Sequence, residues 1–122
     1  MGYESRVYIV EKTDVIDVGM RYARMICAFD LGKCYPLSDT LRNKPKTDCY
    51  IYEYDGNTRV LEDCYGQALT ESDLQTVIDI LEKMTEDNTY RYTLPLLEAL
   101  KAFEKQRQQG LWRNIAVLHY GY

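Results

Sequence analysis

The sequence predicts one α+β domain spanning residues 1–122, with an antiparallel or mixed sheet covered on one face by two helices. The length of 122 residues suits a single domain with one core. Apolar residues make up 46% and charged residues 28%, which is typical of globular proteins. Strand-like segments fill the first half, and two helical segments precede a final apolar run. This order favours helices segregated to one side of a sheet.

The N-terminal third predicts two strands. Residues 3–10 are rich in β-branched and aromatic side chains, and after a polar break residues 14–19 are predicted to form a loop. In 20–31, alternation predicts a strand that leaves Tyr22 and Arg24 accessible, although a helix remains an alternative. The inward set of that strand is Ala23, Met25, Cys27 and Phe29.

A long irregular connection with one helical turn is predicted for residues 32–48. The segment holds Gly32, Pro36 and Pro45, together with the run Arg42-Asn43-Lys44. Connections of this length are often functional.

A central β-hairpin is the clearest local prediction. Residues 49–54 and 59–64 form its strands, and Asp55-Gly56-Asn57-Thr58 supplies the turn. Period-two spacing places Tyr50, Tyr52 and Tyr54 on one face. This row is either a wall of the core or a surface that stacks a ligand or partner.

The C-terminal half predicts two helices and a strand. Thr70 followed by Asp73 resembles a capping box, and the first helix covers 71–86. Thr93 and Pro95 open a second helix that Gly110 ends. The apolar stripe of that helix is Leu96, Leu97, Leu100 and Phe103. Residues 115–118 lack alternation, which indicates a strand buried on both faces and central in the sheet.

The cysteines favour neither a metal site nor disulfides. Cys27, Cys34, Cys49 and Cys64 form no closely spaced pair, and the single histidine, His119, follows the last of them by 55 residues. The N-terminus lacks a secretory signal, and no apolar run has the length of a membrane span. We therefore expect reduced cysteines, no metal, no cofactor and a cytoplasmic location.

Catalysis is the minority interpretation. His119 lies in a predicted strand, where a histidine is more often structural than catalytic. A pairing of Cys27 or Cys34 with His119 stays open, but no local pattern supports an activated thiol. The sequence contains no phosphate-binding glycine-rich loop and no nucleophile-elbow or zinc-protease motif. We expect no catalytic residues.

The sequence holds more features of ligand binding than of catalysis. Arginines lie beside aromatic residues in three clusters. Such a cluster could stack a base and bind a phosphate. The alternative is structural: the aliphatic part of the arginine side chain only covers the edge of the core. Asn88 and Asn114 could contact base edges or ribose hydroxyls. The predicted ligand-binding residues are Tyr22, Arg24, Asn88, Tyr90, Arg91, Trp112, Arg113 and Asn114. Together they would suit a small anionic, aromatic ligand.

The net charge of −4 is unevenly distributed. Residues 61–87 carry eight acidic side chains and a single basic one, Lys83. Such a run is usually a solvated helix face, and it argues against binding to duplex nucleic acid. The sharper alternative is a docking surface for a basic partner.

Three segments carry a resemblance to a known family. They are the opening Met-Gly-Tyr-Glu-Ser-Arg-Val-Tyr-Ile-Val-Glu-Lys, the Thr-Asp-Cys-Tyr-Ile-Tyr segment with its Asp-Gly turn, and the closing Trp-Arg-Asn-Ile-Ala-Val-Leu-His-Tyr-Gly-Tyr. The chain resembles small phage or prophage proteins of gut Firmicutes, and among them most closely the Thoeris anti-defence sponge family. That resemblance implies tight, non-hydrolytic binding of cyclic ADP-ribose isomers, and in some members cyclic oligonucleotides, by a symmetric oligomer in the infected bacterium.

Two further functions stay open: an anti-CRISPR-like inhibitor that contacts its target through the acidic face, and a hydrolase of the same signals. The twelve tyrosines also exceed what one small core hides, which favours a homo-oligomer. We expect the ligand at the subunit interface, with the row of Tyr50, Tyr52 and Tyr54 as the candidate contact surface.

Overall fold

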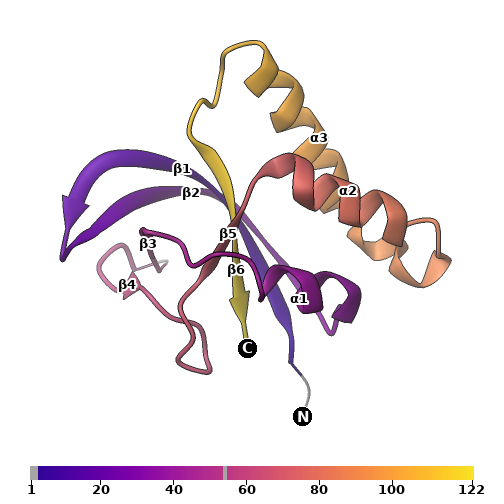
Figure 1. Cartoon of the computed structure of the whole chain (residues 1–122), viewed down its shortest axis with the longest axis horizontal. Helices are drawn as coiled ribbons and strands as arrows, with labels where there is room; N and C mark the ends of the chain where they lie inside the picture. The colour runs from indigo at the N-terminus through magenta and orange to yellow at the C-terminus, as the bar shows by residue number, and fades with distance from the viewer. Residues whose placement is uncertain (1–2, 54) are drawn as a thin grey trace.

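The computed structural model describes residues 3–53 and 55–122 and confirms an α+β fold (Figure 1). Six strands form one mixed sheet in the order β4-β3-β2-β1-β6-β5. The strands are β1 (Ser5–Asp17), β2 (Met20–Gly32), β3 (Cys49–Tyr52), β4 (Arg59–Val60), β5 (Thr70–Ser72) and β6 (Ile115–Gly121). The helices are α1 (Tyr35–Leu41), α2 (Leu74–Met84) and α3 (Leu94–Gln108), with a 3-10 helix η1 (Asn88–Thr93) before α3.

β1 and β2 form a long antiparallel hairpin in the middle of the sheet. The loop predicted over 14–19 is shorter than expected, because β1 continues to Asp17 and only Val18 and Gly19 form the turn. Both turn residues have positive φ, +49° and +75°. Two-residue hairpin turns of this kind match the twist of the strands that they join.

A bulge in β2 overturns part of the predicted alternation. Ile9 pairs with Cys27 and Val10 pairs with Met25, so Ile26 is the extra residue. A bulge shifts the side-chain alternation by one residue. Ala23 and Met25 therefore lie on one face of the sheet, whereas Cys27 and Phe29 lie on the other.

The predicted 49–64 hairpin forms at the edge of the sheet rather than at its centre. β3 and β4 pair antiparallel through two residues each, and Tyr54 lies outside the described residues. The carboxylate of Asp55 accepts hydrogen bonds from the backbone of Asn57 and Thr58, which confirms the predicted turn. Tyr50 is only 1% exposed, so at this residue the tyrosine row is a wall of the core.

The C-terminal strand β6 lies inside the sheet, between β1 and β5, and its residues 116–119 are buried. β6 is the neighbour of the edge strand β5, whereas β1 and β2 are the two central strands. β5 was not predicted. β5 includes Thr70, so the predicted capping box is absent. Asp73 alone caps α2, and its carboxylate accepts a hydrogen bond from the Thr76 N–H at 2.7 Å.

The helices cover one face of the sheet (Figure 1). Leu74, Val77, Ile78 and Leu81 of α2 pack with Leu96, Leu97 and Leu100 of α3 against the sheet. α1 adds Leu37 and Leu41 to the same core. Gly110, at φ +93°, ends α3 as predicted, because its N–H and that of Leu111 bond back to Arg107 and Gln106.

The opposite face of the sheet is curled around a second, smaller core. Its buried residues include Tyr8, Val10, Ile51, Leu69 and Leu118. The segment before β3 approaches β5, because the Thr47 N–H bonds to the Leu69 carbonyl and the Glu71 N–H bonds to the Pro45 carbonyl, both at 2.9 Å. The segment 45–52 thus joins the β5 edge to β2 and closes the curl.

Candidate functional site

A cleft of about 610 Å³ lies where α1, β5 and β6 meet the N-terminal end of the chain. Tyr3, Asp63, Thr70 and His119 line it together with the segment that follows α1. That segment supplies Arg42, Asn43, Lys44 and Lys46, and the loop before β5 supplies Gln67 and Ala68. The volume is within the range of small-molecule sites, roughly 300 to 1,000 Å³.

The backbone fixes the cationic segment against the sheet. Thr70 Oγ1 donates to the Leu41 carbonyl at 2.7 Å, which ties the end of α1 to β5. Lys46 forms an isolated bridge with Thr70. These contacts hold the segment that carries Arg42, Lys44 and Lys46 against β5, and all three residues line the cleft.

The cleft is electropositive although the protein is acidic. Its lining carries three cations and one carboxylate, that of Asp63, whereas the net charge of the whole chain is −4. Within residues 3–53 and 55–122, no ion pair involves Arg42, Lys44 or Lys46. Unpaired cations in a concave site focus the field onto an anionic ligand.

His119 forms part of the floor in a neutral state. It is 4% exposed, and its Nε2 lies 2.9 Å from the Oγ of Ser5, which is fully buried. Burial lowers the pKa of His119 from 6.5 to about 4, with the Arg42 charge acting in the same direction and Asp63 opposing it. At neutral pH the imidazole therefore contributes a hydrogen-bonding group rather than a charge.

Tyr3 forms an aromatic wall of the cleft. Its ring stacks with Tyr65 at 5.4 Å and with His119 at 5.9 Å between centroids. The Arg42 guanidinium lies 5.3 Å from the same ring. A Cβ on Gly121 would collide with the Tyr3 ring, so a glycine is needed there for this close approach.

Two of the three predicted arginine–aromatic clusters lie at opposite ends of α3. Asn88, Tyr90 and Arg91 precede α3, while Trp112, Arg113 and Asn114 follow it. The 15 residues of α3 span about 22 Å, which exceeds the reach of one nucleotide-sized ligand. None of the eight residues lines the 610 Å³ cleft, and a ligand site built from them stays a prediction.

Each predicted cluster has a local structural role. Arg24 forms an ion pair with Glu11 at 2.7 Å, and the Tyr22 ring packs on Tyr50 and Tyr52. Trp112 Nε1 donates to Gln106 at 2.6 Å, and its ring meets Phe103 edge-on. Tyr90 packs against the helical core, whereas Asn88, Arg91 and Asn114 are exposed. Arg113 lines a separate cavity of about 240 Å³ beside two carboxylates, Asp73 and Glu104.

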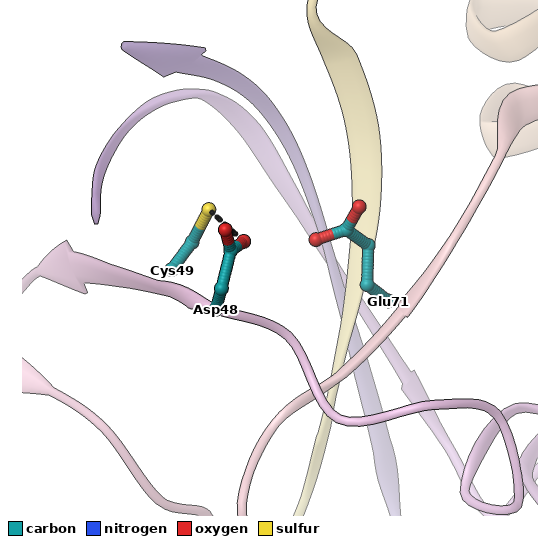
Figure 2. Close-up of side chains that lie close together, drawn as sticks. All are labelled: Asp48, Cys49 and Glu71. Carbon is teal, nitrogen blue, oxygen red and sulfur yellow. Dashed lines mark hydrogen bonds between the residues drawn. The ribbon is translucent and has the colours of Figure 1, made fainter. Parts of the chain in front are cut away.

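Asp48, Cys49 and Glu71 place three potential metal ligands within 4.8 Å of one another (Figure 2). A lysine ammonium already lies among them, since Lys12 Nζ is 2.9 Å from Glu71 and 3.6 Å from Asp48. The Cys49 thiol donates to Asp48 at 3.3 Å, and its pKa is raised to about 11, mainly by burial. A metal would require the thiolate, so this group fits an ion-pair network that fastens β3 and β5 to β1.

No family model matches the sequence, and neither a curated protein nor a solved structure shows detectable similarity to the chain. Across residues 3–53 and 55–122, no helix has the length and apolar character needed to cross a membrane.

Sequence reasoning missed this cleft because its parts are far apart along the chain. Residues near positions 3, 42–46, 63–70 and 119 meet only after the sheet has formed. One signal was present: the cationic run Arg42-Asn43-Lys44 stands in the long connection that was expected to be functional.

Proposed function

We propose that this protein binds a small phosphorylated ligand of the nucleotide class in the cationic cleft and holds it without hydrolysing it. The observation that carries the proposal is the convergence of Arg42, Lys44 and Lys46 on one cleft of an acidic protein. Arginine and lysine are the side chains that bind phosphate oxygens best. Asn43, Gln67 and Thr70 add neutral groups able to bind hydroxyls of a sugar.

Non-hydrolytic binding is favoured by the state of the only histidine. His119 Nε2 is engaged by Ser5, and Ser5 has no exposed surface on which to attack a substrate. The two residues therefore lack the arrangement of a nucleophile with its base at an open site.

The narrower form of the proposal names the ligand as a nucleotide immune signal, such as a cyclic ADP-ribose isomer. Its support is the resemblance of the three sequence segments to the Thoeris anti-defence sponge family. In that role the protein would act in the cytoplasm of an infected bacterium and lower the concentration of free signal.

Mass spectrometry of compounds released by heat from the purified protein tests the proposal. Wild-type protein incubated with extract of signal-producing cells should release an intact phosphorus-containing compound. The Arg42→Ala/Lys44→Ala variant should release little of it, whereas Arg113→Ala should match the wild type. Release of hydrolysed product would identify an enzyme instead, and equal yields from all three proteins would rule out the cleft.

A contact inhibitor acting through the acidic face is the second candidate. Asp79, Glu82, Glu86 and Asp87 are exposed on α2 and just beyond its end. Replacing Glu82, Glu86 and Asp87 by lysine should abolish inhibition by such a protein, but should leave ligand release from the cleft unchanged. The two candidates therefore give opposite results with the same variant.

A further inference from the structure

A small pocket lies on the face of the sheet that carries the smaller core. Its volume is about 210 Å³. Five of its lining residues belong to that core or pack against it, so its walls are mainly aromatic and aliphatic. β2 contributes Met25, the β3–β4 hairpin contributes Ile51, Tyr52 and Val60, and β1 and β6 contribute Arg6, Tyr8 and Tyr120.

The size of this pocket suits one large side chain better than a metabolite. Its volume is below the roughly 300 to 1,000 Å³ of small-molecule sites. Apolar pockets that take one anchoring side chain are the usual centres of protein–protein contacts. The pocket therefore points to a segment of another protein rather than to a free ligand.

The backbone next to the pocket is free to receive such a segment. β2 pairs with β1 along one edge, but β3 pairs with its other edge only at Arg21 and Tyr22. Within the described part of the chain, no strand, bridge or loop backbone bonds to that second edge between positions 23 and 31. A row of unpaired N–H and C=O groups is a template for an added strand.

The open edge and the pocket meet at Met25, which belongs to both. Side chains of a strand alternate between the two faces of a sheet. Every second side chain of a strand added beside β2 would therefore fall on the face of Met25 and Ala28, which pack on the smaller core. In strand addition, main-chain hydrogen bonds supply affinity, and pockets for alternate side chains supply specificity.

The rim of the pocket is acidic. Glu53 and Asp55 line it and are exposed, and neither forms an ion pair with another described residue. The cation in the lining, Arg6, is already paired with Asp30. The uncompensated negative charge favours a lysine or arginine in the partner. Residues two apart in a strand share a face, so the basic residue belongs two positions from the anchor.

We infer that the open edge of β2 and this pocket bind an extended segment of a partner protein. The segment adds as a strand beside residues 23–31, places one large apolar side chain in the pocket, and carries a lysine or arginine two positions away. Among the described residues, the pocket and the cationic cleft have no lining residue in common. This surface therefore acts independently of the ligand in the cleft.

Selection from a displayed library of random short peptides on the purified protein tests the inference. Peptides with a large apolar residue two positions from a lysine or arginine should be enriched. Hydrogen exchange should then show slower exchange at amides 23–31 in the presence of a selected peptide, and no change in α3. Selection without that spacing, or binding that leaves amides 23–31 unchanged, would overturn the inference.

Methylation of the selected peptide separates strand addition from binding in the pocket alone. Only every second amide of an added strand faces its neighbour. N-methylation of one alternate set of peptide amides should therefore abolish binding, whereas methylation of the other set should be tolerated. The same effect from both sets would contradict a strand added to β2.

A charge reversal tests the rim. Glu53→Lys alters an exposed side chain, so it should leave stability unchanged but weaken the selected peptide roughly tenfold. A peptide whose basic residue is replaced by glutamate should regain binding to this variant. Glu98→Lys, on the exposed side of α3, is the matched control and should bind like the wild type. Unchanged binding by Glu53→Lys would contradict the proposed partner. Protection of amides 23–31 that rises with protein concentration without peptide would assign the edge to a second copy instead.

Discussion

His119 links the cleft to the pH dependence of stability. Burial lowers its pKa from 6.5 to about 4, so between these values the unfolded chain binds a proton that the folded protein does not. Its contribution to stability is therefore complete above pH 6.5 and is lost as the pH falls toward 4. The loss amounts to about 3 kcal/mol, given 1.36 kcal/mol for each pKa unit.

Urea unfolding at pH 7 and pH 4.5 checks this expectation. The wild type should lose more unfolding free energy between the two values than His119→Gln, which does not titrate. Asp55 and Asp73, whose pKa values are lowered mainly by hydrogen bonds from Thr58 and Thr76, contribute at lower pH. Equal losses in both proteins would show that His119 is not the buried neutral group described.

Gly121 controls the position of Tyr3. An alanine there would drive its Cβ into the Tyr3 ring, so Gly121→Ala should destabilise the protein by about 1 to 3 kcal/mol. The cost should shrink in a Tyr3→Ala background, where the ring is absent. Thermal unfolding of the two single variants and the double variant measures this coupling. Additive effects would mean that the two residues do not touch.

Particular elements show what sequence patterns can and cannot predict. The helices α2 and α3 follow from apolar spacing, and Gly110 predicts the end of α3, because these signals are local. β5 is three residues long and depends on pairing with β6, so no local pattern announces it. The bulge at Ile26 likewise arises from the pairing of β1 with β2 and reverses faces that strict alternation assigned.

Leu100 tests the packing of the helical layer. It belongs to α3 and is fully buried in the core that α3 forms with α2 and the sheet. Leu100→Ala should therefore lower the free energy of unfolding by about 2 to 5 kcal/mol, through lost burial and a cavity. Glu98→Ala, on the exposed side of the same helix, is the matched control and should change stability little. Chemical denaturation compares the two. A small effect of Leu100→Ala would mean that this face of α3 does not contact the core.

At the scale of the whole molecule, the fold class was predictable and the site was not. Helix and strand patterns are encoded over short stretches, whereas the cleft gathers side chains from both ends and the middle of the chain. Within each arginine–aromatic cluster the residues are neighbours in the sequence. In the structure, however, two of the clusters lie at opposite ends of α3. Whether any of those eight residues binds a ligand stays a prediction.

The curl of the sheet explains how an acidic chain presents a basic cleft. Closing the segment 45–52 against β5 and β2 brings the cationic residues 42–46 beside β5 and β6. The ion pair between Lys12 and Glu71 stabilises the same arrangement from the other face of the sheet. Carboxylates of α2 remain on the outer surface, so the two charge types are segregated by the fold.

Calorimetric titration of the wild type, Arg42→Ala and Arg113→Ala with cyclic ADP-ribose and with inorganic pyrophosphate tests the central claim most directly. Removing the Arg42 guanidinium should weaken binding roughly ten- to a hundredfold, through loss of one charge-assisted contact worth about 1.5 to 3 kcal/mol. Arg113→Ala should bind like the wild type, because Arg113 lies outside the cleft. Weakening by Arg113→Ala with Arg42→Ala unaffected, or no binding of either anion by the wild type, would contradict the assignment of the cleft.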